Sequence, residues 1–331
     1  MTFFLGVDGG GTCTRAILVD ELGQVHGYGL AGPSNYDDIG QTQAQLNIAA
    51  AVTEAWQQIG QPIQRSEAAF LGMAGVVSEA DRDVIRAIAA NLDLAPSDAV
   101  GVDHDIRIAL AGGLSGRPGI ALIAGTGSAC YGRNVNGESW RSGGWGQLIG
   151  DEGSAYWLGV QAMRSIVRAY DGRGRQTNLQ DAVLAQLDIN DIDDIMHRLY
   201  GRGLSRSEIA SLAPLVVVAA EEGDRVAQQL LDRAASDLAG CVTAVIEKLN
   251  LSDSSELVLI GGLLTNARAI RDRLETELAR CSPTCRIVPT EMPPVLGAAL
   301  LAIMRHEPNP SPKVPAAMKE SVNRLPQPEE G

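Results

Sequence analysis

The sequence predicts an α/β protein built from two similar halves. Near the N-terminus, residues 3–20 read as a buried strand, a run of three glycines and a second strand. The same order of strand, glycine turn and strand returns at residues 120–135. The chain has 331 residues, whereas single domains cluster near ~100–150 residues, so two domains are expected. We interpret the repeated pattern as an internal duplication.

Composition and charge narrow the class of protein. Apolar residues make up 45% and charged residues 20% of the chain, which is typical of a globular protein. The net charge is −13, from 27 basic and 40 acidic residues. Because an acidic chain repels nucleic acids and anionic lipids, no nucleic-acid or membrane partner is expected. A phosphate-bearing ligand would have to be held locally, by backbone N–H groups.

The five cysteines are scattered along the chain and odd in number. A chain of this size does not need disulfides for stability, so they are expected to be reduced thiols. Neither a signal-peptide pattern nor an apolar run of 18 residues occurs in the sequence. These features predict a cytoplasmic protein.

The first half reads as strands alternating with helices. Apolar or β-branched runs predict strands, and apolar residues at helical spacing predict helices. In chain order, strands are expected at 3–7, 14–20, 24–30, 68–76 and 98–103, and helices at 34–59, 81–92 and 106–114. Together they predict an N-terminal domain at 1–115.

The second half contains a longer helical span. After the strands of 120–135, helices are expected at 153–170 and over most of the chain to residue 249. A strand then ends at Gly261 and Gly262, and a helix follows at 266–280. This predicts a C-terminal domain at 116–293. The apolar helix at 294–306 is expected to complete the N-terminal domain. The remaining residues, 307–331, include six prolines without periodicity and predict a disordered tail.

The glycine clusters are interpreted as phosphate-binding turns. A dinucleotide fingerprint is a poor match because a strand, not a helix, follows the first glycines. A P-loop is excluded because the chain has no Gly-Lys pair. The third interpretation is a β-hairpin turn whose N–H groups face a phosphate chain. An ordinary tight hairpin is the alternative, but the recurrence of glycines at three strand ends favours phosphate. The residues concerned are Gly9, Gly10, Gly11, Thr12, Thr14, Gly125, Gly127, Gly261 and Gly262.

Asp8 ends the first strand beside the glycines. A carboxylate aimed at a triphosphate is repelled by it unless a cation lies between them. We therefore expect Asp8 to bind Mg²⁺ through water. The alternative is a turn aspartate that caps its own backbone.

Several segments carry a resemblance to a known family. They are "GVDGGGTCTRAILVD", "IAGTGSACYG", "GGWGQLIGDEGSAYWLG", "VLIGGLLTN" and "PPVLGAALLA". They resemble the BadF/BadG/BcrA/BcrD ATPase family of the sugar kinase and actin superfamily, and within it the amino-sugar kinases. The resemblance implies two ribonuclease-H-like (actin-like ATPase) domains around a nucleotide cleft, with ATP and Mg²⁺ as cofactors. It also implies phosphorylation of N-acetylglucosamine or glucosamine to the 6-phosphate, in many members by a homodimer.

A sugar kinase needs in-line positioning, neutralised phosphates and a base near the acceptor hydroxyl. Asp103 and Asp105 both lie where a strand ends and a helix begins. Asp105 precedes a helix of small residues and lies 20 residues before Gly125, as the family's catalytic aspartate does, so it is the expected base and Asp103 the second choice. His104 stands where the family often has Asn. The alternative role of Asp105 is a helix N-cap.

The resemblance also places the sugar. The loop around residues 143–157 would line the sugar site, with Asp151 accepting hydrogen bonds from hydroxyls and with Trp145 and Gly144 forming the wall. Asn35 matches the family's sugar-binding asparagine, and Thr126 would contact either the sugar or the phosphates. Gly261 and Gly262 would lie on the adenosine side. The alternatives are charge at a helix N-terminus for Asp151 and a turn residue for Asn35.

Two other functions compete with a kinase. The first is an ATP-driven activator of a radical dehydratase or reductase, which bridges an iron–sulfur cluster between subunits with paired cysteines. Cys130 has no such neighbour in the sequence before Cys241. The second is a sensor that binds an amino sugar without turnover. No helix-turn-helix extension is evident for it, and both candidate carboxylates are present.

Overall fold

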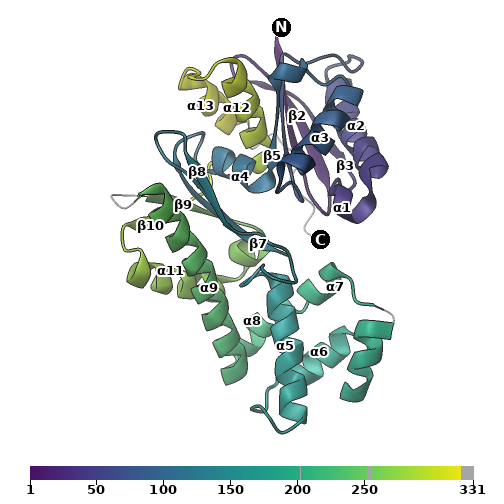
Figure 1. The fold of residues 1–331 in the computed structure, drawn as a ribbon, viewed down its shortest axis with the longest axis vertical. Coiled ribbons are helices and arrows are strands. Elements are labelled where there is room, and N and C mark those ends of the chain that lie inside the picture. Colours follow the sequence, from purple (N-terminus) through teal and green to yellow (C-terminus); the bar gives the residue numbers. More distant parts are fainter. Residues whose placement is uncertain (202, 252–254, 322–331) are drawn as a thin grey trace. The chain divides into compact units, whose positions relative to one another are not determined.

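A computed structural model describes residues 1–201, 203–251 and 255–321. The chain divides into two compact units (Figure 1). Unit 1 comprises Met1–Arg117 together with the chain from Pro289 onward, and unit 2 comprises Pro118–Val288. The predicted second domain, 116–293, differs from unit 2 at both ends. In particular, Met292 packs in the core of unit 1, because it precedes the helix that completes that core.

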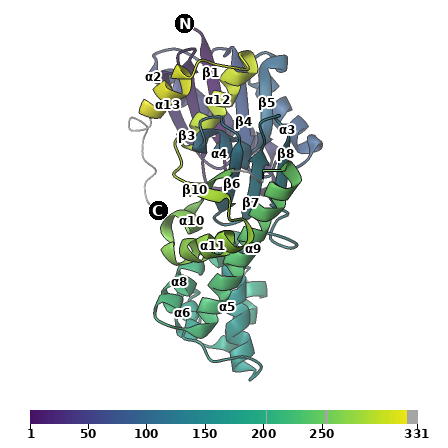
Figure 2. The ribbon, with the colours of Figure 1, turned by 90° about the vertical axis from the view of Figure 1, so that its left-hand side faces the viewer.

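Unit 1 contains a five-stranded sheet in the order β3-β2-β1-β4-β5 (Figure 2). Antiparallel pairing joins β1, β2 and β3, and parallel pairing joins β1, β4 and β5. The strands are β1 (Phe3–Gly9), β2 (Thr14–Asp20), β3 (Val25–Ala31), β4 (Ala68–Met73) and β5 (Val100–His104). The parallel strands β1, β4 and β5 therefore all end at one edge of the sheet.

Helices cover both faces of this sheet. Side chains of α2 and α3 form one core layer with β1 and β4, and those of α4 and α12 form the other. The α-helices are α1 (Tyr36–Ile39), α2 (Gln41–Gln58), α3 (Glu79–Asn91), α4 (Asp105–Gly113), α12 (Pro294–His306) and α13 (Lys313–Glu320), and a 3₁₀ turn, η1 (Ser97–Ala99), precedes β5. The core residues of α12 are almost continuous in sequence because it packs against both the sheet and α4.

Two predictions for unit 1 need correction. The single helix expected at 34–59 is broken at Gly40, whose φ of 81° ends α1 before α2 begins. The tail expected to be disordered contains α13, which buries Val314 and Met318 in the core of unit 1. The prolines of this segment led to the prediction of disorder. Val314 and Met318 lie four residues apart, so a single helical turn brings both onto the core. The residues from 322 onward lie outside the described part of the chain.

Unit 2 repeats the topology of unit 1. Its five-stranded sheet has the order β8-β7-β6-β9-β10, with an antiparallel β6–β7–β8 meander and parallel β6, β9 and β10. The strands are β6 (Gly119–Ala124), β7 (Ser128–Arg133), β8 (Ser139–Gly143), β9 (Ser255–Ile260) and β10 (Cys285–Val288). The internal duplication that the repeated pattern predicted is therefore present in the sheets.

The helices of unit 2 pack around one core with β6, β7 and β9. They are α5 (Ala155–Tyr170), α6 (Leu179–Gln186), η2 (Ile192–Asp194), the π-helical turn η3 (His197–Gly201), α7 (Arg206–Ala210), α8 (Ala213–Glu221), α9 (Arg225–Leu249), α10 (Gly262–Asn266) and α11 (Arg268–Cys281). The 25-residue helix α9 is capped at both ends. Its N-cap, Asp224, accepts hydrogen bonds from the N–H groups of Val226 and Ala227, and its C-cap, Asn250, has the left-handed conformation. Such end signals fix where a helix starts and stops.

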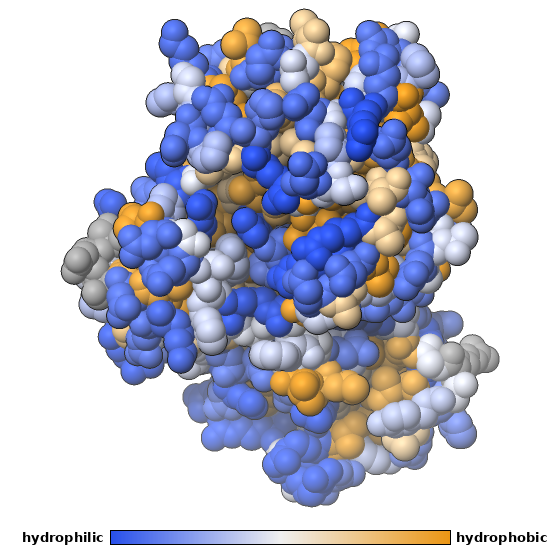
Figure 3. All heavy atoms as spheres, turned by 45° about the horizontal axis from the view of Figure 1, so that its top comes forward, coloured by the Kyte–Doolittle hydropathy of each residue, from blue (hydrophilic) through white to orange (hydrophobic). Residues whose placement is uncertain are grey.

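The surface is largely polar on the face that Figure 3 draws. On the face drawn in Figure 3, hydrophilic residues predominate and apolar residues form small patches between them. Within the described residues, no helix combines the length and apolar character needed to cross a membrane.

Close packing between α4 and α12 generates the first testable prediction. A Cβ atom on Gly297 would lie 2.0 Å from the Ile108 carbonyl oxygen and 2.4 Å from the Gly112 nitrogen. Because backbone must move to admit it, Gly297→Ala should lower the free energy of unfolding by about 1–3 kcal/mol. Gly240→Ala is the control: a Cβ there meets nothing within 4 Å, so it should stabilise α9 by ~0.5–1 kcal/mol. Urea unfolding measures both, and equal effects would contradict the packing argument.

Candidate active site

The acidic residues of unit 1 gather at the ends of its parallel strands. In the sheet register, Asp8 pairs with Gly72 on β4, and Gly72 pairs with Asp103 on β5. Asp105 follows two residues later as the first residue of α4. Ligands of open α/β sheets bind outside the carboxyl ends of their strands. This edge of the sheet is therefore where a ligand of unit 1 is expected.

The surroundings of Asp8 make ionisation of its carboxyl group less favourable than in water. Its side chain is 15% exposed, and the nearest cation is Arg15, whose Nη1 lies 3.7 Å from Oδ2. Burial raises the pKa of Asp8 to about 6; Arg15 opposes this rise, and the negative charge of Asp105 adds to it. Two neighbouring carboxylates that raise each other's cost of ionisation are suited to a shared cation.

The side chains near Asp8 suit Mg²⁺ better than a metal ion that takes all of its ligands from the protein. Among the described residues, no cluster of three or more His, Cys, Asp and Glu could hold a metal ion. Mg²⁺ commonly binds one or two carboxylates and fills its other positions with water and substrate phosphates. Asp8 is therefore compatible with the water-mediated role predicted for it.

Asp103 is occupied by a network of ion pairs. Its Oδ1 accepts from Arg82 at 3.0 Å and from the His104 backbone at 2.9 Å, and its Oδ2 accepts from Arg107 at 2.6 Å. Burial alone would raise the pKa of Asp103, but His104 and the two guanidinium groups outweigh it and leave the pKa lowered. A carboxylate with both oxygens engaged and a lowered pKa is poorly suited to accept a proton.

Asp105 is placed differently from Asp103. The N-cap of α4 is His104, so Asp105 lies inside the first turn and the N-cap alternative does not apply. A carboxylate in the first turn is favoured by the helix dipole. Its charge also reaches Asp8, whose pKa it raises. The bonds to both oxygens of Asp103 make it the weaker of the two candidate bases, and the role of Asp105 as the base stays a prediction.

The first glycine turn closes between β1 and β2. The Gly10 N–H donates to the Cys13 carbonyl at 3.0 Å, and the Gly10 carbonyl accepts from Ser34 at 3.0 Å. Gly11 and Thr12 are exposed. None of the three glycines has a positive φ, so what glycine supplies here is the absence of a side chain. Gly9 has a packing reason of its own, since a Cβ would lie 2.3 Å from the Met73 methyl carbon.

The prediction that Thr14 offers a hydroxyl to the ligand was wrong. Thr14 is fully buried, and its hydroxyl bonds to the Gly32 carbonyl and to the Ser34 hydroxyl, each at 2.7 Å. Thr14 begins β2, where alternate side chains point into the sheet packing. Its hydroxyl therefore fixes the neighbouring 32–34 loop instead.

Asn35 lies beside this turn and caps α1. Its side-chain oxygen accepts from the Asp37 N–H, and its amide donates to Asp38 at 2.7 Å. Asp38 in turn is the nearest neighbour that a Cβ on Gly11 would meet, at 4.0 Å. The structure thus brings Asn35 near the glycine turn, and it also shows the turn role that was the alternative. The two are compatible, because a capping amide can exchange partners with a ligand.

In unit 2 the second and third glycine clusters meet. Gly125 follows β6 and Gly261 follows β9, which are parallel neighbours. A Cβ on Gly125 would lie 3.9 Å from the Gly262 nitrogen. Gly261 has a φ of 96°, and a Cβ there would lie 2.5 Å from the Ala124 carbonyl oxygen. Thr126 is exposed at the tip of the turn.

Asp151 shows the strongest signs of a functional constraint in unit 2. It is 3% exposed and has a φ of 59°, a left-handed conformation that costs energy for a residue with a side chain. Its carboxylate accepts from the Ser128 N–H at 3.4 Å and pairs with Arg206. Burial raises the pKa of Asp151, while Arg206 opposes the rise.

Arg206 is a site residue that sequence reasoning missed. It lies on α7, 55 residues after Asp151. A Cβ on Gly127 would lie 2.6 Å from its Nη2 atom, so the guanidinium packs against both the glycine turn and Asp151. No local motif marks this arginine, because α7 is a five-residue helix within the helical insertion.

The loop before Asp151 presents Trp145 to the surface. Trp145 is 67% exposed, and the Arg141 guanidinium lies 5.3 Å from its ring centre. Gly144 has a φ of 71°, and a Cβ there would lie 3.1 Å from the Ala129 Cβ. The glycines thus turn the loop sharply out of β8 and leave an aromatic face available to a ligand.

Two sheets of one topology, each with a glycine turn after its first strand, define an ATPase of the actin-like fold. The chain belongs to the BadF/BadG/BcrA/BcrD ATPase family, whose model matches residues 5–302.

Individual relatives cover nearly the whole chain. The sequence is 33% identical to the N-acetylmuramic acid/N-acetylglucosamine kinase of Clostridium acetobutylicum, over 91% of this chain and 98% of that protein. It is 32% identical to the N-acetyl-D-glucosamine kinase of Dictyostelium discoideum, over 91% and 97%. A crystal structure described as a putative N-acetylglucosamine kinase from Chromobacterium violaceum superposes with a TM-score of 0.74 at 29% identity, over 92% of this chain and 99% of that one.

The raised pKa of Asp8 generates a prediction on stability. Its pKa is 3.8 without the fold and about 6 within it, so the folded chain binds the extra proton between these values. Stability from this group is therefore greatest at low pH and falls as pH rises from about 4 to 6. Asp8→Asn should remove this loss, on the order of 2–3 kcal/mol. Urea unfolding of both proteins at pH 4–7 measures the difference; a difference that does not change with pH would contradict the burial argument.

Proposed function

We propose that this protein is an ATP-dependent sugar kinase that phosphorylates an amino sugar, N-acetylglucosamine or glucosamine, at the 6-hydroxyl. The observation that carries the proposal is the identity of 32–33% with amino-sugar kinases over 91% of the chain. The glucosamine kinase of Vibrio cholerae is a further relative, 27% identical over 72% of this chain. The acidic and glycine-rich sites of both units are consistent with this chemistry.

The nucleotide is assigned to the glycine turns. In unit 1, the N–H groups of Gly11 and Thr12, which are exposed, would contact the phosphate chain, and Gly9 and Gly10 would let the backbone approach it. In unit 2, the turn of Gly125 and Gly127 would contribute in the same way. The Gly125 N–H already donates to the Gly127 carbonyl at 2.9 Å, so what Gly125 offers is the absence of a side chain. The adenosine side would lie at Gly261 and Gly262. Backbone N–H groups without side chains bind phosphate oxygens closely. The magnesium ion, held through water by Asp8, would neutralise the phosphates.

Asp105 is the proposed general base. Its carboxylate takes the proton of the sugar hydroxyl as the hydroxyl oxygen forms a bond to the γ-phosphorus of ATP. The bond between that phosphorus and the β–γ bridging oxygen breaks, and ADP leaves. Asp103 has a supporting role: by holding Arg82 and Arg107 it fixes the junction of β5 and α4 from which Asp105 projects.

The amino sugar is assigned to Asp151 and its neighbours. Asp151 would accept hydrogen bonds from sugar hydroxyls, and Arg206 would favour its ionised form by opposing the rise in pKa that burial causes. Trp145 and Gly144 would form the wall of the site, and Thr126 would contact the sugar or the phosphates. The family resemblance also assigns a sugar-binding role to the amide of Asn35. Sugar hydroxyls are bound well by such carboxylate and amide groups next to an aromatic face.

The activator function is less well supported than the kinase function. A cluster bridging two subunits requires accessible thiolates. Cys130 is fully buried, and burial raises its pKa well above the ordinary value. A sugar sensor without turnover would not need both the Mg²⁺ carboxylate proposed at Asp8 and the base proposed at Asp105, so the presence of both favours catalysis over sensing.

The homodimer and the cytoplasmic location expected from the sequence remain part of this proposal. The support for a dimer is the family resemblance, and the support for the location is the cysteine content. Light scattering after size-exclusion chromatography tests the first, and fractionation of the source cells tests the second.

A screen of acceptor sugars tests the function as a whole. Coupled assays of ADP release should show turnover with N-acetylglucosamine or glucosamine and much less with glucose. N-acetylmannosamine and N-acetylmuramic acid belong in the same screen, because one relative is named for the latter. Absence of turnover with every amino sugar, while ATP still binds, would overturn the kinase proposal in favour of the sensor.

Exchange of the two candidate bases tests the mechanism. Asp105→Asn should lower kcat by roughly 10²–10⁴-fold, the usual contribution of a general base, and leave ATP affinity unchanged. Asp103→Asn should chiefly lower stability, because Arg82 and Arg107 lose a charged partner. Steady-state kinetics and calorimetric ATP titration separate the effects. Near-normal turnover in Asp105→Asn would assign the base elsewhere.

The pair of Arg206 and Asp151 predicts a pH effect on sugar binding. Arg206→Gln removes the cation that lowers the pKa of Asp151, so Asp151 should protonate at a higher pH than in the unmodified protein. The KM for the sugar should then begin to rise at a higher pH as the solution is acidified, with kcat less affected. Arg173→Gln is the control, since Arg173 is exposed and pairs with Asp171. Identical pH profiles in all three proteins would remove Arg206 from the site.

A further inference from the structure

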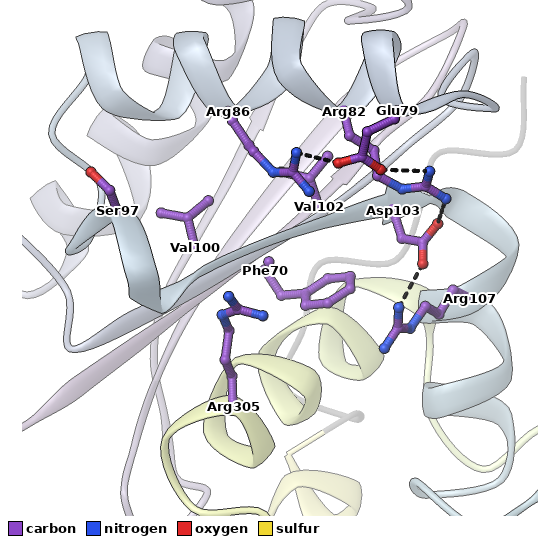
Figure 4. A pocket seen from close by; sticks show the side chains of 11 residues that line it. Phe70, Glu79, Arg82, Arg86, Ser97, Val100, Val102, Asp103, Arg107 and Arg305 are labelled. Atoms are coloured by element: carbon purple, nitrogen blue, oxygen red, sulfur yellow. Dashed lines mark hydrogen bonds and ion pairs between the residues drawn. The ribbon is translucent and has the colours of Figure 1, made fainter. Parts of the chain in front are cut away.

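A cavity of unit 1 lies along the outer edge of its sheet, beside β5 (Figure 4). Its volume is about 380 Å³, within the range of small-molecule sites. The charged residues that line it are Arg82, Arg86, Arg107, Arg305, Glu79 and Asp103. Asp103, Arg82 and Arg107 belong to the framework of the candidate active site, but none of the glycine turns contributes to the lining, and the roles proposed above do not use Arg86 or Arg305.

The lining carries a positive excess in an acidic protein. Four guanidinium groups and two carboxylates give a net charge of +2 (4 − 2), whereas the chain as a whole carries −13. Asp83, outside the lining, reduces the excess by also pairing with Arg86 at 2.8 Å. Arg305 donates to the Asp98 backbone carbonyl at 2.9 Å, and within the described residues it has no carboxylate partner. The cavity therefore attracts anions locally.

The arginines converge from both sides of one strand. Arg86 comes from α3 and Arg305 from α12, and Figure 4 shows them approaching β5 from opposite sides. β5 ends the sheet and pairs only with β4 among the described strands. Arginines on separate elements that converge on a strand without an outer neighbour define a site built by tertiary structure, not by one helix end.

Part of this lining is already held in position. Asp103 fixes Arg82 and Arg107 through bonds of 3.0 and 2.6 Å, and the Arg107 guanidinium lies 5.3 Å from the centre of the Phe70 ring. Phe70 is 4% exposed and supports the guanidinium from below. Side chains that are ordered before binding lose less conformational freedom when a ligand arrives. Arg86 and Arg305 are more exposed and lie at the mouth. Arg86 Nη1 is also oriented by carboxylates, Glu79 at 2.6 Å and Asp83 at 2.8 Å.

We propose that this cavity, the Arg86/Arg305 pocket, binds a phosphate group, either as inorganic phosphate or as the end of a phosphate monoester. Guanidinium groups match the geometry of phosphate oxygens and bind them through paired N–H donors. Two exposed arginines at the mouth would contact the phosphate directly, and Arg82 and Arg107 would add charge from beneath. The proposal concerns unit 1 alone and does not rest on the proposed kinase activity.

Calorimetric titration of the full chain tests the pocket. Sodium phosphate is titrated into the unmodified protein, into Arg86→Gln/Arg305→Gln and into Arg65→Gln/Arg280→Gln, with sodium chloride of equal ionic strength as the reference. The control pair loses the same charge from exposed arginines outside the pocket. We expect saturable binding that weakens at least tenfold in the pocket variant, as lost charge-assisted bonds imply, and less than twofold in the control.

Two further arms identify the source of the phosphate and the place of binding. Titration with glucosamine 6-phosphate distinguishes a phosphate monoester from inorganic phosphate as the ligand. The ester should bind more tightly than inorganic phosphate if the cavity also contacts the sugar. Repeating the titration with excess ADP excludes the glycine turns, since phosphate bound there would be displaced and phosphate in the pocket would not. Circular dichroism establishes that the variants fold, and Arg86→Lys/Arg305→Lys should recover part of the affinity. The proposal would be overturned if phosphate binding did not saturate, if the control pair lost as much affinity as the pocket variant, or if ADP displaced the bound phosphate.

Discussion

Unit 1 depends on the close approach of α12 to α4 and β1. Three positions without side chains make it possible. A Cβ on Gly297 would meet the backbone of α4, one on Gly112 would lie 2.7 Å from the Pro293 carbonyl oxygen, and one on Gly6 would lie 2.4 Å from the Ala299 nitrogen. Backbones this close leave no room for adjustment. Helix α4 is therefore held rigidly against the sheet, and its first residue, Asp105, is held with it.

Charge placement then divides the three aspartates at the sheet edge. Asp103 is neutralised by arginines, which makes it part of the framework. Asp8 has Arg15 at 3.7 Å, but burial and the negative charge of Asp105 still raise the pKa of Asp8 to about 6. Carboxyl groups with shifted pKa values cluster at functional sites, because catalysis needs pKa values that burial and neighbouring charges provide and bulk water does not. The same residue type thus serves as support or as reactive group according to its neighbours.

Sequence reasoning predicted the parts of the fold that follow from local pattern. The duplicated strand, glycine turn and strand, and the apolar helix that returns to unit 1, were visible because hydrophobic periodicity and glycine are local signals. The buried role of Thr14, the pairing of Arg206 with Asp151 and the helix α13 were not. Each depends on residues distant in sequence: Thr14 on Gly32 and Ser34, Arg206 on a loop 55 residues earlier, and α13 on the core it covers. Asp105 could be preferred over Asp103 from family spacing, but the reason that Asp103 is unsuitable appears only in the ion pairs.

The division of the chain has a consequence for its synthesis on the ribosome. Unit 1 is discontinuous, and α12, which shares one of its two core layers with α4, is translated only after the whole of unit 2. Unit 2 is continuous and has a core of its own. The first part of unit 1 must therefore wait with one face of its sheet covered only by α4, while unit 2 can already fold. Such a nascent intermediate exposes apolar surface, and it gives chaperones a defined window in which to act.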